Sequence, residues 1–240
     1  MLEGEAKTPE GMRIYAIGDI HGCLRQLQDI FRQIEFDLLY SNFETYRIIT
    51  IGDYVDRGPD SKGVIDFLIK AKKQHDLVCL RGNHDQRLLE FLDIPEKVGD
   101  GFLTYGGRET LNSYGIEVEE VPNFEALARK LKQAMPRSHI RFLDSLGLIH
   151  IAGDYAFVHA GVKPGVALAD QSPRDLLWIR NEFIQHQKLF EKVIVHGHTI
   201  SDYFDVQPNR INTDTGAFDS GILTCVVLQT SEIEKLQTSK

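Results

Sequence analysis

Acidic, imidazole and amide side chains stand just after several short apolar runs of this 240-residue chain. Six of them could bind a metal: Asp19, His21, Asp53, Asn83, His159 and His198. Carboxylate, imidazole and amide oxygen suit Mn²⁺, Fe, Zn²⁺ or Co²⁺, and no thiolate accompanies them to favour a softer ion. One catalytic ion needs about three protein ligands. Six ligands therefore predict two ions, about 3.5–4 Å apart, that share one carboxylate.

The charges at such a centre predict an anionic substrate. Two divalent ions bring four positive charges, of which Asp19 and Asp53 neutralise two. The remaining positive charge suits a hydroxide and a phosphate ester. Arg57 and Arg180 could hold the phosphate oxygens through paired hydrogen bonds.

The apolar runs themselves are predicted to be strands, because they are short and rich in β-branched residues. The runs are Ile14–Ile17, Ile48–Ile51, Leu77–Leu80, Tyr155–Val158, Val193–Val195 and Ile222–Leu228. Two helical patterns lie between the first three runs, and the second follows a cap at Asp60 or Ser61. This alternation predicts a parallel sheet, and ligands bind outside the carboxyl ends of such strands. The six side chains are therefore expected to converge.

The chain length favours a single domain, which we expect to cover residues 13–240 behind a flexible polar tail at residues 1–12. The strand-rich C-terminal end predicts a second sheet. A third amphipathic helix is predicted over residues 123–135. Glycines and weak periodicity before this helix predict an insertion at about residues 94–136, over one edge of the domain.

Composition limits the partners. The net charge of −8 argues against non-specific binding to nucleic acid or to an anionic membrane. Three widely separated cysteines favour a reducing compartment, and we expect a cytoplasmic protein. No apolar stretch reaches the roughly 18 residues of a membrane span.

Each motif also has an ordinary structural interpretation, since a single Asp or His after a strand usually belongs to a turn. The histidines outside the pattern are expected on the surface: His75, His139, His150 and His186. His196 precedes His198 and could instead support it. Motifs of this kind at five strand ends are not independent turns, however, which favours the metal centre.

Five motifs follow one another along the chain: GDIHG, GDYVDRG, RGNHD, HAG and GHT. In this order they resemble the motifs of the phosphoprotein phosphatase family within the calcineurin-like metallophosphoesterases. The resemblance spans residues 18–199 and implies an α/β fold, a sandwich of two β-sheets flanked by helices, with a dinuclear metal centre between the sheet ends. It implies that Asp19 and His21 bind the first metal, that Asp53 bridges both, and that Asn83, His159 and His198 bind the second. Arg57 and Arg180 would hold phosphate, and Asp56 would orient His84.

The sequence resembles the bacterial and phage branch of this family more than the eukaryotic one, because it has RGNHD where eukaryotic members have RGNHE. Symmetrical diadenosine tetraphosphatases are close relatives, and GNHDQRLL resembles them. They tend to lack the second acid of GDYVDRG and the Thr of GHT, whereas Asp56 and Thr199 are present here. This comparison favours a protein phosphatase.

The expected function is therefore hydrolysis of phosphomonoesters, with serine/threonine phosphoproteins as the first substrate class. The hydroxide shared by two metals, with Mn²⁺ expected first, would attack phosphorus directly. His84, kept cationic by Asp56, would protonate the leaving oxygen. One alternative is a symmetrical dinucleoside polyphosphate hydrolase, and a remote one is an inactive metal-binding scaffold. A phosphorylated protein or a small phosphoester is the expected partner, and the oligomeric state is open.

Overall fold

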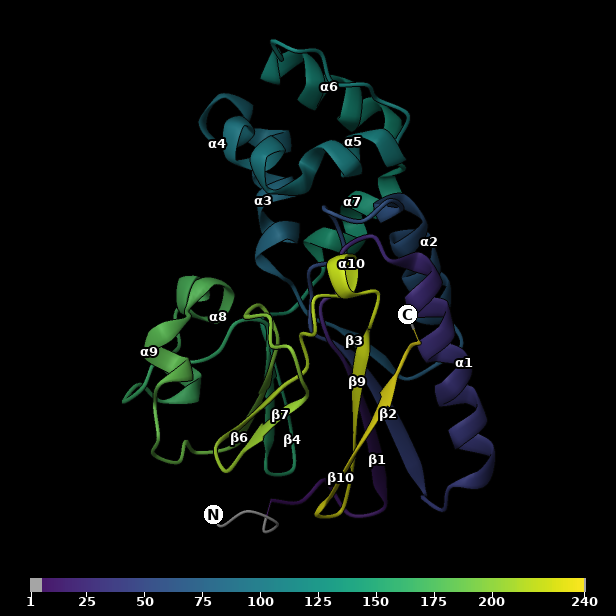
Figure 1. Ribbon diagram of the computed structural model, residues 1–240, viewed down its shortest axis with the longest axis vertical. Coiled ribbons are helices and arrows are strands. Elements are labelled where there is room, and N and C mark those ends of the chain that lie inside the picture. Colours follow the sequence, from purple (N-terminus) through teal and green to yellow (C-terminus); the bar gives the residue numbers. More distant parts are fainter. Residues whose placement is uncertain (1–5, 240) are drawn as a thin grey trace.

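The computed structural model describes residues 6–239 and contains two five-stranded sheets packed face to face, with helices on both outer faces (Figure 1). The strand order in the first sheet is β10-β9-β1-β2-β3. Its strands are β1 Met12–Ile17, β2 Thr45–Thr50, β3 Leu77–Cys79, β9 Thr224–Gln229 and β10 Glu232–Gln237. The first three run parallel, and β9 is antiparallel to both β1 and β10.

The second sheet has the order β4-β5-β6-β8-β7. Its strands are β4 Ile149–Ala152, β5 Tyr155–Val158, β6 Val193–His196, β7 Asp205–Gln207 and β8 Arg210–Asn212. The central strands β5, β6 and β8 are parallel, and the edge strands β4 and β7 are antiparallel to their neighbours. Both sheets thus contain parallel strands, the arrangement that gathers ligands at one end.

Helices cover the outer faces of the two sheets. On the first sheet lie α1 Leu24–Tyr40 and α2 Ser61–Ala71, and on the second lie α8 Pro173–Trp178 and α9 Asn181–Ile184 (Figure 1). The predicted cap of α2 is Asp60, whose side chain accepts a 2.7 Å hydrogen bond from the Gly63 amide. A short 3₁₀ turn, Leu168–Asp170, precedes α8.

A further group of helices, which we call the helical cap (residues 83–144), lies above the end of the sheets at which β3 finishes (Figure 1). It consists of α3 Asn83–Asp93, α4 Pro95–Phe102, a kinked turn Leu103–Gly107, α5 Arg108–Ser113, α6 Phe124–Ala134 and α7 Arg137–Asp144. The short α10, Ala217–Ser220, lies beneath the cap. The cap and α10 therefore border the same end of the sandwich as the strand ends.

The protein has three apolar cores, and the side chains along β1 alternate between two of them. Ile14 and Ala16 pack between the sheets with Phe157, whereas Tyr15 and Ile17 pack on the opposite face with α1 and α2. This is the two-residue period of a strand buried on both faces. A third core fills the space between the second sheet and α8 and α9.

All six predicted strands are present, but one lies in a different sheet from the one expected. The last run forms β9 and joins the first sheet beside β1, while β4 to β8 make up the second sheet. The order of strands depends on pairing between distant residues, and the local apolar pattern does not carry that information.

The weakly periodic, glycine-rich part of the expected insertion, residues 94–122, is mostly helical. Its helices α4 and α5 have only 8 and 6 residues, so neither repeats its apolar pattern often enough to be recognised. The predicted helix at residues 123–135 corresponds to α6.

The expected tail extends over residues 1–12, of which residues 1–5 lie outside the described part of the chain. Its remainder contacts the domain, because Ala6 and Thr8 are buried and the Thr8 amide donates a 3.0 Å hydrogen bond to Thr230 O. The packed chain thus starts before Arg13. None of the described helices combines the length and apolarity that crossing a membrane requires.

Candidate metal centre

The six predicted ligands converge at the carboxyl ends of the strands, as expected, and all are buried. Asp19 and His21 follow β1, and Asp53 follows β2. Asn83 opens α3 shortly after β3, His159 follows β5, and His198 follows β6. Both sheets therefore contribute to one site, from five separate strand ends.

The backbone at this site is held in an uncommon conformation. Left-handed φ angles occur at His21 (44°), Asp53 (50°), Asp56 (71°), Arg57 (68°) and His198 (64°). Such angles cost roughly 1–3 kcal/mol each in non-glycine residues and cluster at functional sites. The turns they form redirect the side chains from the strand axis toward one another.

Asp53 lies at the middle of the cluster. Its Oδ2 is 3.4 Å from His21 Nε2, and its Oδ1 is 3.5 Å from His159 Nε2. Asp53 also belongs to both groups of ligand atoms that lie within 4.8 Å of one another, His21–Asp53–His84 and Asp53–His159–His198. One carboxylate with an oxygen facing each group has the geometry of a bridging ligand.

Hydrogen bonds to the backbone fix the orientation of two imidazoles. His21 Nδ1 lies 2.8 Å from Val55 O, and His159 Nδ1 lies 3.2 Å from Ile51 O. Since a carbonyl only accepts, each Nδ1 donates, and the neutral ring presents its Nε2 lone pair to the site. Burial lowers the pKa of His21 to about 3 and also lowers that of His159, so both rings are neutral at physiological pH.

The remaining ligands provide a test of whether a metal fits. Asp19 Oδ1 and His198 Nε2 are buried and have no hydrogen-bond partner among the described residues. Asn83 Oδ1 lies 2.8 Å from His159 Nε2, although neither atom can donate when Nδ1 carries the ring proton. Two buried acceptor atoms that face one another with no proton between them repel each other, and a bound cation would turn this repulsion into attraction to both atoms. The site therefore fits a pair of divalent ions.

Two glycines make room for these ligands. A Cβ on Gly82 would overlap the Asp53 carboxylate, and a Cβ on Gly197 would overlap that of Asp19. Any other residue at either position would displace a ligand. This explains why glycine precedes Asn83 in RGNHD and His198 in GHT.

His84 and Asp56 form a pair at the edge of the centre. His84 Nδ1 is 2.7 Å from Asp56 Oδ2, and Asp56 Oδ1 accepts a 2.6 Å hydrogen bond from Thr110 of α5. Burial opposes a charged imidazole, but Asp53 and the hydrogen bond to Asp56 outweigh it and raise the pKa of His84. A cationic His84 at this position can donate a proton.

Both predicted arginines border the site. Arg57 is half-buried, with its Nη2 3.3 Å from His84 Nε2 and its guanidinium 4.7 Å above the ring of Phe218. Arg180 is exposed, and its charge adds to the effect of burial in lowering the pKa values of His159 and His198. Two cationic side chains thus stand beside a cluster that fits metal ions, and together they suit an anionic ligand such as a phosphate.

The structure adds residues that the sequence pattern did not single out. Asp85 accepts hydrogen bonds from the amides of Asp53 (2.9 Å), Tyr54 (2.9 Å) and Gly82 (2.8 Å), and so shapes the Asp53 turn. Asp214 is also buried; burial raises its pKa to about 6, and its charge adds to burial in raising the pKa of Asp19. Asp85 belongs to the RGNHD motif and Asp214 to the stretch NTDTG at residues 212–216, but the turn at Asp53 and the carboxylate of Asp19, on which they act, are distant from them in sequence.

The histidines outside the pattern differ in burial. His139 is fully buried between Tyr114 Oη and Asp66 Oδ1, both at 2.8 Å, so its expected surface position was wrong. Its amphipathic helix α7 packs against α2, a contact that the local sequence does not reveal. His196 packs edge-on against Phe183 at 4.8 Å and belongs to neither ligand group.

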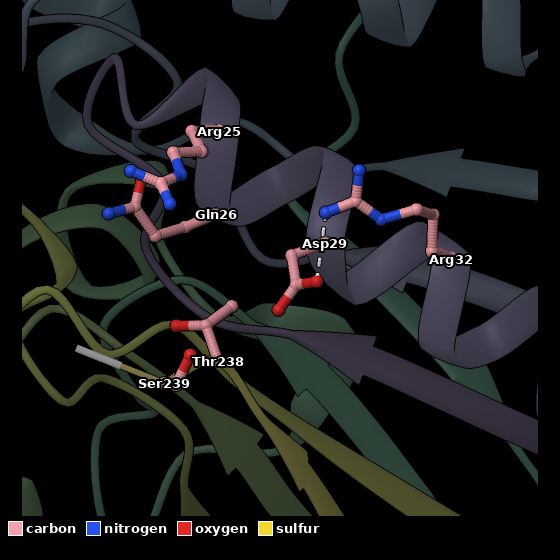
Figure 2. Close-up of a pocket in the computed structure, with 6 residues that line it drawn as sticks. All are labelled: Arg25, Gln26, Asp29, Arg32, Thr238 and Ser239. Carbon is pink, nitrogen blue, oxygen red and sulfur yellow. Dashed lines mark hydrogen bonds and ion pairs between the residues drawn. The ribbon is translucent and has the colours of Figure 1, made fainter.

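A separate hollow of about 120 Å³ lies beside α1 (Figure 2). It is lined by Arg25, Gln26, Asp29, Arg32, Thr238 and Ser239, none of which belongs to the metal cluster. Arg25 and Arg32 are exposed, and Asp29 pairs with Arg32 at 3.0 Å.

The chain is similar in sequence to known phosphoesterases. The family model described as calcineurin-like phosphoesterase matches residues 12–215. A symmetrical bis(5′-nucleosyl)-tetraphosphatase of Aromatoleum aromaticum is 32% identical over 64% of this chain and 46% of its own length. An asymmetrical bis(5′-nucleosyl)-tetraphosphatase of Oceanobacillus iheyensis is 24% identical over 89% of this chain and 87% of its own length. The chain thus spans less than half the length of the symmetrical relative.

Solved structures show the same fold. That of a candidate diadenosine tetraphosphatase has a TM-score of 0.66 and 23% identity, covering 95% of this chain and 94% of that one. A serine/threonine phosphatase of Saccharomyces cerevisiae has a TM-score of 0.55 and 16% identity, covering 96% and 80%. At these identities the likeness concerns the fold alone.

Proposed function

The chain belongs to the calcineurin-like phosphoesterase family, and from that premise we propose that it is a metal-dependent phosphoesterase that hydrolyses dinucleoside polyphosphates. The family resemblance of the motifs is thereby confirmed, and so is the expected α/β fold of two sheets flanked by helices. The proposed substrate is the alternative considered from the sequence. The relatives named as tetraphosphatases favour it over the phosphoprotein that the motifs suggested first.

One observation carries the metal dependence. The two oxygens of buried Asp53 face two different histidines, while Asp19 Oδ1 and His198 Nε2 have no partner among the described residues. Two divalent ions held by this donor set would polarise the phosphoryl group and supply a nucleophile at neutral pH. These donors suit Mn²⁺, Fe, Zn²⁺ or Co²⁺, and Mn²⁺ is the ion that we propose to test first.

The other residues of the site have separate tasks in the proposal. Arg57 and Arg180 bind phosphate oxygens and hold phosphorus in reach of the ligand cluster. His84 holds a proton on Nε2 and transfers it to the leaving oxygen, while Asp56 fixes the ring through Nδ1. Thr110 in turn holds Asp56, so the helical cap takes part in placing the proton donor.

A serine/threonine phosphoprotein is the second candidate substrate. Asp56 and Thr199, both present here, match the protein-phosphatase form of GDYVDRG and GHT. The metal centre recognises only a phosphoryl group, so the choice between the two substrates depends on the surfaces around it.

Substrate preference tests the proposal directly. The kcat/KM of the full chain is measured for diadenosine tetraphosphate and for a phosphothreonine peptide at matched Mn²⁺. We expect the dinucleotide to have the higher value. A strong preference for the peptide would contradict the proposed substrate and would favour protein phosphatase activity.

Metal dependence is tested on the same preparation. Chelation should abolish activity, and added Mn²⁺ should restore it. Asp29 is a half-buried acid on α1 that lies outside the ligand cluster, so Asp29→Asn serves as a control that should respond to both treatments like the wild type. Full activity in the chelated protein would contradict the dinuclear centre.

A further inference from the structure

A cluster of one arginine and two aromatic rings borders the metal centre. The guanidinium of Arg87 lies 5.0 Å from the centroid of the Tyr105 ring and 4.8 Å from that of Trp178. Arg87 comes from α3, Tyr105 from the kinked turn between α4 and α5, and Trp178 from the end of α8. The cluster therefore joins the helical cap to the helices on the second sheet.

Both ends of this cluster reach residues of the site. The ring of Trp178 meets that of the predicted ligand His198 edge-on, with centroids 6.3 Å apart. Next to Tyr105, the carbonyl of Gly106 accepts a 3.1 Å hydrogen bond from the Arg57 amide. The cluster thus extends from a metal ligand to a phosphate-binding arginine, along one side of the centre.

The local backbone holds Tyr105 in this place. Gly106 has a φ of 104°, and a Cβ there would overlap the backbone of Arg57. A side chain at position 106 is therefore excluded on two grounds, by conformation and by contact. The backbone leaves helical angles at Tyr105 and Gly106, and this kinked turn is fixed against Arg57 by the hydrogen bond from the Arg57 amide to Gly106 O.

The cluster contains an exposed aromatic ring and N–H donors that have no partner among the described residues, and both are available to bind a ligand. Tyr105 is 53% exposed, an unusual exposure for a large ring next to a buried site. Trp178 and Arg87 are half-buried, and the side chain of Arg87 makes no hydrogen bond or ion pair with any residue in the range 6–239. Its planar guanidinium lies against both rings, and its five N–H donors have no acceptor within that range.

These features suit a ligand with an aromatic base joined to several phosphates. We infer that Tyr105, Arg87 and Trp178 form the subsite for the nucleoside end of the substrate, an inference that rests on the proposed function. The exposed ring of Tyr105 stacks on the base, and Arg87 binds a phosphate of the chain beyond the one held by Arg57 and Arg180. Trp178 supports the guanidinium from the side of His198. A phosphopeptide supplies neither a base nor a second phosphate.

Kinetics of substituted proteins test this subsite. For Tyr105→Ala, kcat/KM for diadenosine tetraphosphate should fall about 10-fold more than kcat/KM for nitrophenyl phosphate, mainly through KM, as expected for the loss of one base–aromatic stack. Tyr105→Phe keeps the ring and should restore the ratio. Arg87→Ala should shift the ratio in the same direction, and Arg87→Lys should not restore it, because lysine lacks the planar fork.

Tyr40→Ala is the matched control, since Tyr40 is a 75% exposed ring at the end of α1. It should leave the ratio of the two substrates unchanged. Equal losses for both substrates in Tyr105→Ala and Arg87→Ala, or no loss in either, would overturn the inference.

Binding separates the subsite from the proposed function. Calorimetry on the Mn²⁺-loaded chain compares adenosine 5′-monophosphate with ribose 5-phosphate, which lacks the base. We expect the former to bind about 10-fold more tightly, and Tyr105→Ala to remove the difference. No preference in the wild type, or a preference that survives in the variant, would refute the subsite. If the wild type prefers the phosphopeptide while this base preference holds, the proposed function fails but the nucleoside subsite remains.

Discussion

At Asp53, a single carboxylate faces both halves of the centre, with its two oxygens 3.4 and 3.5 Å from His21 and His159. Asp53→Asn should therefore reduce the binding of both ions, because an amide offers one neutral oxygen in place of two charged ones. Asp19→Asn should reduce the binding of only one. The measurement is metal content per chain by atomic emission after dialysis against Mn²⁺. Two tightly held ions in Asp53→Asn would contradict the bridging role.

A second prediction at the scale of the residue concerns His84. His84→Asn should lower kcat by about 10²–10⁴-fold for substrates whose leaving oxygen needs a proton. The loss should be larger for phenyl phosphate than for nitrophenyl phosphate, because nitrophenolate leaves without protonation. Metal content should stay close to that of the wild type. Equal losses for the two esters would show that His84 serves metal binding or structure and does not donate the proton.

Among the elements, α2, α5 and α7 are joined by hydrogen bonds through the buried ring of His139. The ring of His139 connects Tyr114, which follows α5, with Asp66 of α2. His139→Ala would leave the buried Tyr114 hydroxyl without a partner, so the free energy of unfolding should fall by about 1–3 kcal/mol. Urea denaturation measures the change. His186→Ala, at a half-buried position, is the control and should stay within about 0.5 kcal/mol.

The sequence reveals the strand ends of this fold well and the helical cap poorly. The runs before Asp19 and Asp53 are continuous, β-branched and followed by glycine, so the strands and the candidate ligands after them could be predicted together. The cap helices α4 and α5 are too short for periodicity, and the glycines between them read as a loop. The hydrogen bond of Thr110 to Asp56 joins residues 54 positions apart. No local pattern contains such a contact, and the same holds for β9 beside β1.

At the scale of the whole molecule, the first sheet and α1 are tied together by a polar cluster on Arg13. Arg13 donates to Asp37 of α1 (2.8 Å), to Gln229 of β9 (2.6 Å) and to Glu234 of β10 (3.1 Å). Tyr15 of β1 also donates to Asp37, at 2.6 Å. Hydrogen bonds and ion pairs thus stabilise the edge of the first sheet that is farthest from β3, whereas apolar packing stabilises the three cores.

This cluster gives the stability a dependence on pH. Burial disfavours the charged carboxylate of Asp37, but hydrogen bonds from Tyr15, Arg13 and Ser41 outweigh it and lower its pKa. A carboxyl whose pKa is lower in the folded state stabilises the fold above its unfolded-state pKa of about 4, and this stabilisation is lost as the pH falls through the folded-state value.

Asp37→Asn should therefore be less stable than the wild type at pH 6–7, and the difference should shrink steadily below about pH 4. Urea denaturation of the chelated proteins from pH 7 to pH 3 measures it without a contribution from metal release. Asp29→Asn removes an exposed pair with Arg32 and should show almost no difference at any pH, because surface ion pairs contribute little. A difference between Asp37→Asn and wild type that stays constant down to pH 3 would mean that Asp37 stabilises the fold by packing, whatever its charge.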